Sequence, residues 1–439
     1  MKEKQFLSRR RFLGGAAAAA AGAGIGIPKR LFAGSRYEET SEPKIKEYRT
    51  LGRTGFKASD IGLGAGYVTD TALMGAILDS GINYIDSAES YGQGQVERTF
   101  GEAMKNRDRK SVFITSKMGL REEDTKEGLK ERALKCLERI QSEYVDCMMI
   151  HMPSSVALMK HEGFHAAIRE LKTEGKVRFC GLSQHGSQWQ DLPETMEQVC
   201  LAAAEDGRFD VMLFVYNFIQ TDMGEKILKV CKEKNIGATL MKTNPVGKYL
   251  AMKGMMEQMQ KEGQEIPDYF SKLIPRVKAT ADMAESFKQK FNLTNDNEVR
   301  DAALKFVLNN PNVSSACVSV TNFDDLKAFV KLSGQKFDLK AQQTLAAYRS
   351  VFGGLYCRHA CGQCESSCPQ RVPVNTIMRY YHYFTAQGRE KAAMTKYAGL
   401  PNKANVCADC AGHCEKACPY GVPIHGELAI AHKTLSLNV

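Results

Sequence analysis

Residues 84–97 read Y-I-D-S-A-E-S-Y-G-Q-G-Q-V-E, an apolar run that gives way to polar residues and glycine. The apolar run predicts a strand over Tyr84–Ala88, with Asp86 near its end and Tyr91 in the loop that follows. A segment long enough for a helix comes next, before another apolar run begins. The same succession of strand, loop and helix-length segment recurs along most of the chain.

Eight such runs, rich in β-branched residues, are candidate strands. They are Ser59–Gly64, Tyr84–Ala88, Ser111–Lys117, Tyr144–His151, Val177–Gln184, Val211–Asn217, Ile236–Thr243 and Ser314–Val320. Because parallel neighbours need long crossover connections, this pattern predicts a parallel (β/α)8 TIM barrel of the α/β class.

The chain is longer than a single barrel requires. It has 439 residues, of which 43% are hydrophobic and 25% charged, an ordinary globular composition. We expect the barrel over residues 34–345 and a small, mostly helical domain over residues 346–439.

One connection within the barrel, residues 244–297, is too long for the pattern and is interpreted as an insertion. Met252, Met255, Met256 and Met259 are spaced as one face of a helix. This spacing favours core packing of an inserted helix pair, since methionine fills irregular gaps. An active-site lid is the alternative, because long loops at the carboxyl end of a barrel cover the substrate.

The first 33 residues have the charged, apolar and cleavable parts of an export signal. The paired arginines within Ser8–Gly14 resemble the twin-arginine consensus, and a weakly apolar stretch follows over residues 16–27. That stretch is short and poorly hydrophobic for a membrane anchor. We expect residues 1–33 to be a signal peptide that the twin-arginine export machinery recognises, which makes the mature protein periplasmic or otherwise exported.

The basic character of the chain is concentrated in this signal. The formal net charge is +10, but residues 1–33 contain seven Lys and Arg against one Glu, so the remainder carries about +4. A balance this small, with no basic cluster on a recognisable helix, predicts no nucleic-acid partner.

Four polar residues occupy the carboxyl ends of predicted strands or the loop after one of them. Asp86, Lys117 and His151 end the second, third and fourth strands, and Tyr91 follows the second. Barrel active sites are built at these positions, so we expect the four side chains to converge. The Lys117 ammonium should lower the pKa of Tyr91 from its usual value of about 10. Singly, these residues are usually a strand cap, a solvated lysine or a packed histidine.

Several stretches resemble the aldo-keto reductase family in order, spacing and strand position. They are Y-I-D-S-A-E-S-Y-G-Q-G-Q-V-E, V-F-I-T-S-K, D-C-M-M-I-H and G-K-V-R-F-C-G-L-S-Q-H. The resemblance implies that Tyr91 is the general acid in carbonyl reduction and the base in alcohol oxidation. It also implies that Lys117 and Asp86 support Tyr91 and that His151 orients the substrate. The substrate would be a small carbonyl compound or alcohol, and sugar-like molecules are among the candidates.

The resemblance also implies an NAD(P) cofactor bound without a glycine-rich loop. By family position, Ser183 and Gln184 face the nicotinamide carboxamide and Met241 lies against the nicotinamide ring. Gln184 replaces the usual asparagine, and Met241 replaces an aromatic residue. Three further residues are candidates to bind phosphate at a helix N-terminus, namely Ser319, Thr321 and Asn322. The adjacent Asp324 and Asp325 would repel a 2′-phosphate, which counts against a preference for NADP and leaves the choice between NAD and NADP open.

Eight of the fourteen cysteines form two compact sets in the last 83 residues. The sets are Cys357, Cys361, Cys364 and Cys368 before a proline, and Cys407, Cys410, Cys414 and Cys418 before another. Disulfides and two zinc sites are the alternatives to iron-sulfur clusters. Zinc ribbons usually separate two short knuckles by a long hairpin, whereas each set here is one run. The other six cysteines are expected to be small buried apolar residues.

Both sets resemble the bacterial two-cluster ferredoxin run, although each contains one extra residue. This resemblance implies two 4Fe-4S clusters in a ferredoxin-like domain over residues 346–439, in which the fourth cysteine of each set serves the other cluster. One cluster would then take Cys357, Cys361, Cys364 and Cys418, and the other Cys407, Cys410, Cys414 and Cys368.

The two predicted halves differ in the electrons that they carry. A nicotinamide transfers a hydride, whereas a cluster accepts one electron, and no flavin motif bridges the two. The clusters are therefore either structural or exchange electrons with a redox partner protein. An electron-transfer or scaffold subunit with a non-catalytic barrel is the alternative to an enzyme. Because free nicotinamide cofactor is scarce outside the cytoplasm, we also expect the cofactor to be loaded before export and retained.

Overall fold

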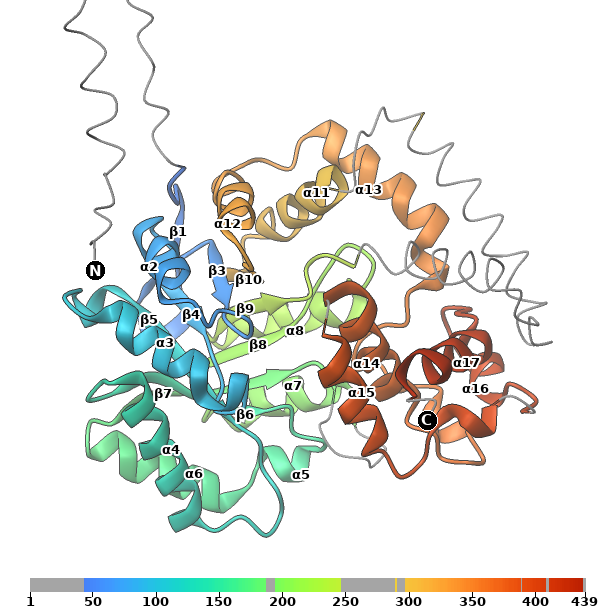
Figure 1. Ribbon diagram of the computed structural model, residues 1–439, viewed down its shortest axis with the longest axis horizontal. Helices are drawn as coiled ribbons and strands as arrows, with labels where there is room; N and C mark the ends of the chain where they lie inside the picture. Colours follow the sequence, from blue (N-terminus) through green and yellow to red (C-terminus); the bar gives the residue numbers. More distant parts are fainter. Residues whose placement is uncertain are drawn as a thin grey trace, which may run out of the picture. The chain divides into compact units, whose positions relative to one another are not determined.

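Eight parallel strands close into a barrel in the computed structural model, which describes residues 43–186, 194–245, 289, 297–387, 389–407 and 410–436. Each strand pairs with the next, and the last pairs with the first, so the predicted barrel is confirmed (Figure 1). The strands are β3 (Ile61–Gly64), β4 (Tyr84–Asp86), β5 (Phe113–Met118), β6 (Val145–His151), β7 (Val177–Gln184), β8 (Val211–Val215), β9 (Gly237–Met241) and β10 (Ser315–Val318).

All eight predicted strands overlap these elements, and most of the observed strands are shorter. Strand β7 has the predicted ends, whereas β8 stops at Val215 instead of Asn217. The Asn217 side chain accepts hydrogen bonds from the backbone N–H groups of Ile219 and Gln220, at 3.0 and 2.9 Å. This turn ends the strand because the asparagine side chain takes the place of a backbone partner.

Helices follow the strands and cover the outside of the barrel. Those of the barrel are α2 (Thr71–Asp79), α3 (Gln95–Met104), α4 (Lys126–Ile140), α5 (Val156–Met159), α6 (Glu162–Thr173), α7 (Met196–Asp206), α8 (Asp222–Glu233), α11 (Asn297–Leu308) and α12 (Phe323–Val330). Several begin at side chains that accept backbone N–H groups, and Thr195 and Gln198 form a capping box at α7.

A short antiparallel hairpin precedes the barrel and was not predicted. It pairs β1 (Tyr48–Thr50) with β2 (Lys57–Ser59). Leu51 and Ala58 from this hairpin are fully buried in one cluster with residues of the barrel interior. The hairpin contacts the start of β9, where a Cβ added at Gly52 would lie 2.2 Å from the Gly237 nitrogen. It therefore covers the amino-terminal end of the barrel.

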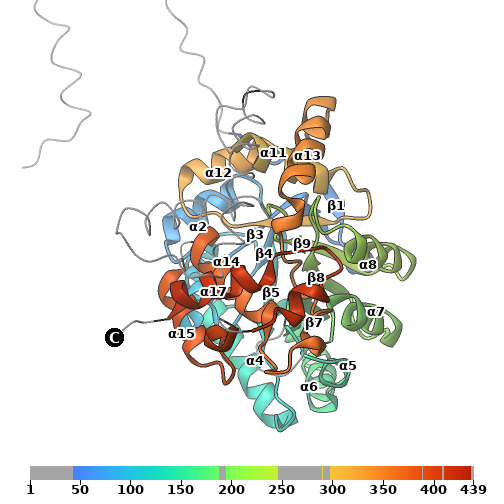
Figure 2. The same cartoon turned by 90° about the vertical axis from the view of Figure 1, so that its right-hand side faces the viewer.

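Residues after the barrel form helices α13 (Leu339–Phe352), α14 (Val374–Gln387), α15 (Glu390–Ala398), α16 (His413–Lys416) and α17 (Ile424–Leu435). Helix α13 crosses the expected boundary at residues 345 and 346, because Leu345 and Tyr348 pack in one cluster with α11 residues. Helices α14 and α17 have a core of their own and belong with the barrel to one compact unit, Glu42–Val439. Figure 2 shows these helices in front of the strands.

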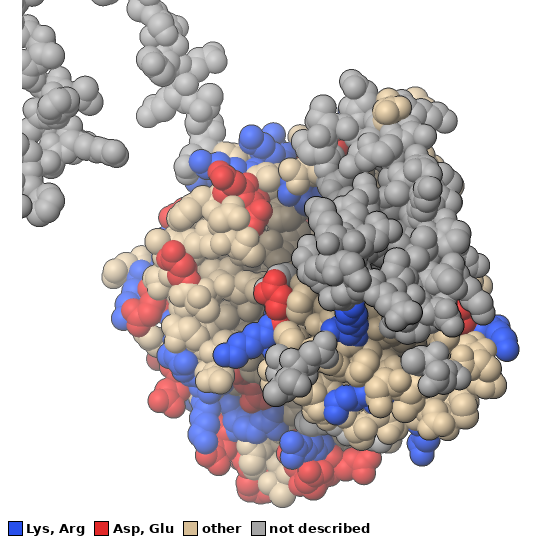
Figure 3. Space-filling view, turned by 45° about the vertical axis from the view of Figure 1, so that its right-hand side comes forward, with Lys and Arg blue, Asp and Glu red and all other residues tan. Residues whose placement is uncertain are grey.

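Two predicted segments lie outside the described residues: the signal peptide, and nearly all of the 244–297 insertion with its four methionines. Among the helices that are described, none combines the length and apolarity of a membrane span. On the face drawn in Figure 3, acidic and basic side chains are interspersed over the barrel.

Candidate active site

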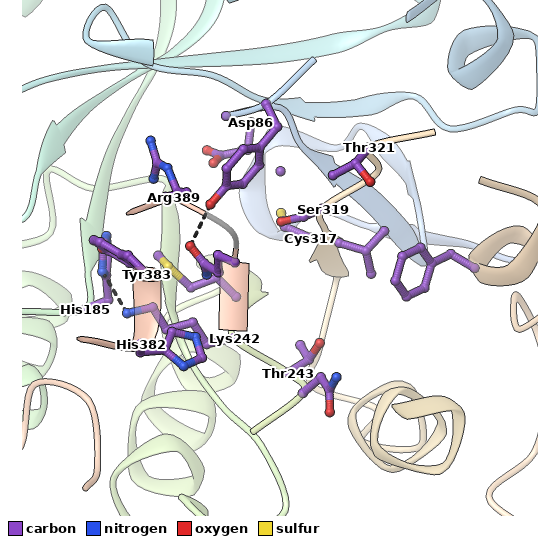
Figure 4. A pocket seen from close by; sticks show the side chains of 18 of the residues that line it. Asp86, His185, Lys242, Thr243, Cys317, Ser319, Thr321, His382, Tyr383 and Arg389 are labelled. Atoms are coloured by element: carbon purple, nitrogen blue, oxygen red, sulfur yellow. Dashed lines mark hydrogen bonds between the residues drawn. The ribbon is translucent and has the colours of Figure 1, made fainter. Parts of the chain in front are cut away.

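A cavity of about 480 Å³ lies at the carboxyl ends of the strands. From the barrel it is lined by Gly64, Gly66, Tyr67, Asp86, Tyr91, His185, Met241, Lys242, Thr243, Asn244, Arg300, Leu304, Cys317, Val318, Ser319, Thr321 and Phe329. From the C-terminal helices it is lined by His382, Tyr383, Gln387 and Arg389 (Figure 4).

Strand alternation explains why the predicted catalytic residues meet. Side chains two positions apart on a strand share a face, and the aromatic rings of Tyr84 and Phe113 stack inside the barrel with centroids 5.8 Å apart. Asp86 lies two positions after Tyr84, and Lys117 lies four positions after Phe113. Both therefore point inward at the carboxyl end of the barrel.

Lys117 and Asp86 form a buried ion pair. The Lys117 Nζ atom donates to Asp86 Oδ1 at 2.7 Å and also donates to the Ser87 carbonyl oxygen. Burial acts to lower the pKa of Lys117, but the charge and hydrogen bond of Asp86, together with the charge that Tyr91 carries once it is ionised, hold that pKa above its usual value. The lysine is therefore an ammonium ion at neutral pH.

Tyr91 lines the cavity beside this pair. The Lys117 Nζ atom lies 5.0 Å from the centroid of the Tyr91 ring. Burial raises the pKa of Tyr91, and the Lys117 charge offsets this only in part, so the net direction is upward from 10.0. The Lys117 ammonium thus lowers this pKa as predicted, but the net shift is upward because burial of the phenolate has the larger effect. Tyr91 is a protonated phenol that the ammonium stabilises as it ionises.

His151 is packed directly against Tyr91. The two rings are 6.0 Å apart and meet edge to face, and only 5% of His151 is exposed. Burial and the Lys117 charge lower the pKa of His151 well below 6.5. The imidazole is therefore neutral at physiological pH and cannot supply a proton as an imidazolium, and neither His151 nor Lys117 is among the residues that line the cavity.

The predicted cofactor-binding residues divide into two groups. Met241, Ser319 and Thr321 line the cavity. Ser183, Gln184 and Asn322 are not among its lining residues.

Each member of the second group is hydrogen-bonded within the chain. The Ser183 hydroxyl donates to the Ile150 carbonyl oxygen at 3.5 Å, and the Gln184 amide donates to the Pro153 carbonyl oxygen at 2.7 Å. Strand alternation turns Gln184 to the opposite side from Ser183. Asn322 caps α12 by accepting from the backbone of Asp325 at 2.8 Å.

The start of α12 is occupied by one of the chain's own carboxylates. Asp325 accepts hydrogen bonds from the Thr321 backbone and hydroxyl, at 3.1 and 2.5 Å, and from the Asn322 amide at 3.1 Å. These are donors that a phosphate would otherwise use at a helix N-terminus. A negative charge at this edge of the cavity disfavours a second one from a 2′-phosphate.

Sequence reasoning missed the contribution of the C-terminal helices to the cavity. The Tyr67 hydroxyl donates to Gln387 at 2.6 Å, and Gln220 exchanges two hydrogen bonds with the backbone of His359, at 2.8 and 2.9 Å. The Arg389 guanidinium lies 4.7 Å from the Tyr67 ring centroid. No motif in the sequence marks these contacts, because they join residues more than a hundred positions apart.

The eight C-terminal thiols fall into two groups in space, and each group combines both sequence sets. Cys357, Cys361, Cys364 and Cys418 line one small cavity. Burial raises the pKa of Cys407 to about 12, and the charges of Cys414, Cys368 and Cys410 contribute to that shift. The fourth cysteine of each set therefore lies with the other set.

All fourteen cysteines are free thiols, and the six in the barrel are buried. The expectation that those six are small buried residues is thus confirmed. Within the part of the chain that the structure describes, no three His, Cys, Asp or Glu side chains are placed to hold a single metal ion.

Known proteins are similar to this chain over the barrel. An Aldo-keto reductase YhdN of Bacillus subtilis (strain 168) is 24% identical over 319 residues, which are 68% of this chain and 92% of that protein. A Probable aldo-keto reductase 1 of Glycine max is 26% identical over 230 residues, covering 48% of this chain and 62% of the other.

Among solved structures, the holo form of aldo-keto reductase AKR11C1 from Bacillus halodurans has the same fold. Its TM-score is 0.50 at 19% identity, over 69% of this chain and 95% of that one. The sequence profile described as "Aldo/keto reductase family" matches residues 64–347, which is more than half of the chain. The chain therefore belongs to the aldo/keto reductase family and is an NAD(P)-dependent oxidoreductase.

Proposed function

We propose that this protein is an exported oxidoreductase that interconverts a small carbonyl compound and its alcohol, with Tyr91 as general acid and base. The observation that carries the proposal is the buried Lys117–Asp86 pair beside the Tyr91 ring in a cavity at the carboxyl ends of the strands. This cavity is large enough for a small substrate together with the reactive end of a dinucleotide.

The nicotinamide dinucleotide supplies the hydride to the carbonyl carbon when it is bound. Tyr91 donates its phenolic proton to the carbonyl oxygen, and the Lys117 ammonium stabilises the phenolate that forms. Neutral His151 orients that oxygen through a hydrogen bond. In alcohol oxidation Tyr91 takes the proton back. Met241 and Ser319 are the residues best placed to hold the dinucleotide, because the donors of Thr321 in the same cavity are already bonded to Asp325.

The cofactor bound in this site is proposed to be NAD rather than NADP. The Asp325 carboxylate at the start of α12 supports this choice, because it would face a 2′-phosphate with a like charge.

The proposal includes two 4Fe-4S clusters in the C-terminal domain. Cys357, Cys361, Cys364 and Cys418 would hold one cluster, and Cys368, Cys407, Cys410 and Cys414 the other. The grouping of thiols across the two sequence sets supports this assignment.

Export through the twin-arginine pathway completes the proposal. Its support is the arginine pair within Ser8–Gly14, together with a C-terminal domain that would have to receive its clusters before leaving the cytoplasm. Replacing both Arg9 and Arg10 by lysine is expected to leave the protein in the cytoplasm. Cell fractionation tests this, and export of that variant at the normal level would contradict it.

Substitution of Tyr91 by Phe tests the enzymatic proposal against a scaffold with a non-catalytic barrel. We expect a loss of about 10²- to 10⁴-fold in carbonyl reduction, the usual contribution of a general acid. Iron content and visible absorption should not change. Tyr144→Phe is the matched control, since Tyr144 directly precedes β6 and is not among the residues that line the cavity. A native protein that reduces no carbonyl compound would leave the scaffold interpretation, whereas equal reduction by the native protein and the Tyr91 variant would mean that Tyr91 is not the general acid.

A further inference from the structure

The cavity has two chemically different walls. One is formed at the end of β10 and the start of α12, where Ser319 and Thr321 lie. Figure 4 shows His185, Lys242, His382, Tyr383 and Arg389 gathered on the other side, with side chains from the loops after β7 and β9 and from the C-terminal helices. The mechanism proposed above gives this second wall no task.

Arg389 is held on this wall by aromatic rings instead of a carboxylate. Its guanidinium carbon lies 4.7 Å from the centroid of the Tyr67 ring and 5.5 Å from that of Tyr383. Its backbone N–H donates to the Tyr383 carbonyl oxygen at 3.0 Å, which fixes the start of α15. Among the described residues, no Asp or Glu forms an ion pair with Arg389.

Lys242 adds a second basic group to the same ring. Its Nζ atom lies 5.5 Å from the Tyr383 centroid, the same separation as for Arg389. The Lys242 Nζ atom contacts the Nδ1 atoms of His185 and His359, at 3.1 and 3.0 Å. No described carboxylate forms an ion pair with Lys242 either.

The charges around the wall are unbalanced. Asp86 is the one carboxylate among the cavity-lining residues that the structure describes, and it is already paired with Lys117 at 2.7 Å. Burial and the charge of Arg379 lower the pKa of Lys242 well below 10.5. An anion bound at the wall would offset both effects, because it compensates for lost water and for the repulsion.

The position of Arg389 ties this wall to the reacting group. Arg389 and Tyr91 line the same cavity, and the Tyr67 ring that Arg389 covers follows Gly66, where an added Cβ would lie 3.7 Å from the Tyr91 ring. A substrate whose carbonyl oxygen meets Tyr91 can therefore place its remaining part near Arg389. Guanidinium is the group best suited to a planar carboxylate, because it offers two parallel N–H donors.

We propose that the wall formed by Arg389, Lys242 and Tyr383 binds a carboxylate of the carbonyl substrate, so that this enzyme acts on aldehydes and ketones that are also acids. This inference rests on the proposed reductase function and specifies its substrate class. A phosphate of the dinucleotide is the other anion that the same charges could attract, and the experiment below separates the two.

The kinetic test compares acids with neutral isosteres. The probes are 4-carboxybenzaldehyde against 4-formylbenzamide, and succinic semialdehyde against its amide, with NADH. We expect kcat/KM to favour each acid, and Arg389→Gln to remove about tenfold to a hundredfold of that preference, as a lost charge-assisted hydrogen bond does. The loss should fall mainly on the KM of the acid. Arg389→Lys should restore part of it, and Lys391→Gln, at an exposed position on α15, should change nothing.

Two results would overturn the inference. One is a native enzyme with no preference for the acids. The other is an Arg389→Gln variant whose KM for NADH rises while its kcat/KM falls equally for acid and amide, because the charge would then serve the dinucleotide.

A binding measurement separates this inference from the catalytic proposal. Calorimetry with 4-(hydroxymethyl)benzoate and 4-(hydroxymethyl)benzamide requires no turnover, and Tyr91→Phe can be used alongside the native holoprotein. We expect the native protein to bind the carboxylate more tightly than the amide, and Arg389→Gln to weaken binding of the carboxylate at least tenfold. If the carboxylate binds in this way but the native protein reduces no aldehyde, the proposed function fails and the anion site stands. If acid and amide bind equally, the anion site fails whatever the activity.

Discussion

The Lys117 ammonium lies 2.7 Å from the Asp86 carboxylate, and the two side chains are only 1% and 5% exposed. Charges this deeply buried persist only when each compensates the other. Burial raises the pKa of Asp86 in spite of the Lys117 charge. The two residues therefore depend on each other for their charged forms. The pKa of Tyr91 responds to both charges, because Lys117 lowers it and Asp86 raises it.

Substitution of one member of the pair should destabilise the protein more than substitution of both. Lys117→Met leaves a buried carboxylate without its cation, at a cost of up to about 3–5 kcal/mol in the free energy of unfolding. The double variant Asp86→Asn, Lys117→Met should recover part of that loss. Chemical denaturation of the four proteins in a double-mutant cycle measures the coupling. Additive losses would show that the pair is not energetically coupled. Both single variants should also lose carbonyl reduction.

The pH dependence of reduction should be flat across the neutral range. The pKa of Tyr91 is raised above 10.0 by burial, so the phenol keeps its proton until the pH rises through that value. The pKa of His151 is lowered well below 6.5, so the imidazole stays neutral as the pH falls through 6.5. Values of kcat/KM from pH 6.5 to about 9 should therefore show neither limb. A basic limb near pH 7 would mean that Tyr91 ionises far more easily than its burial allows.

The carboxylate of Asp325 should set the preference between NADH and NADPH. It occupies the donors of Thr321 at the start of α12, and it would repel a 2′-phosphate. We expect a lower KM for NADH than for NADPH, and Asp325→Asn should narrow that difference by about tenfold or more. Asp324→Asn is the matched control, because it removes an exposed neighbouring charge, whereas the carboxylate that accepts from Thr321 is that of Asp325. Equal effects of the two variants would indicate a general charge effect.

Loss of one cysteine should release iron from the spatial group to which it belongs, not from the set that contains it in the sequence. Cys418→Ser should empty the site that it shares with Cys357, Cys361 and Cys364, leaving about four of about eight iron atoms per chain. Cys200→Ser, at a buried position in α7, should retain all of them. Iron and sulfide analysis with visible absorption reads this out. Loss of zinc in place of iron, or the formation of disulfides in the native protein, would contradict the assignment.

Loss of clusters should also impair the active site. The thiols Cys364, Cys407 and Cys414 lie within the hydrophobic core of the C-terminal helices, and α14 from that core lines the cavity. Cys418→Ser is therefore expected to lower the thermal midpoint and raise the KM for substrate, although Cys418 lies outside the catalytic cavity. Full activity in a protein without clusters would show that α14 keeps its place beside the cavity without them.

Strand period and cysteine spacing are properties of the sequence, and they determined the barrel, the convergence of Asp86, Lys117 and His151, and the candidate cluster ligands. Local repetition is sufficient for these inferences, because strand alternation and parallel crossovers follow from backbone geometry. The hairpin at residues 48–59 escaped prediction, since its strands are only three residues long.

Only the tertiary structure decided the electrostatics and the walls of the site. The upward shift in the pKa of Tyr91 depends on how many groups bury it, and the contacts of Arg389 with Tyr67 and Tyr383 depend on where α14 and α15 pack. Desolvation and contacts between residues distant in the chain arise from the whole packing arrangement, so no local pattern records them.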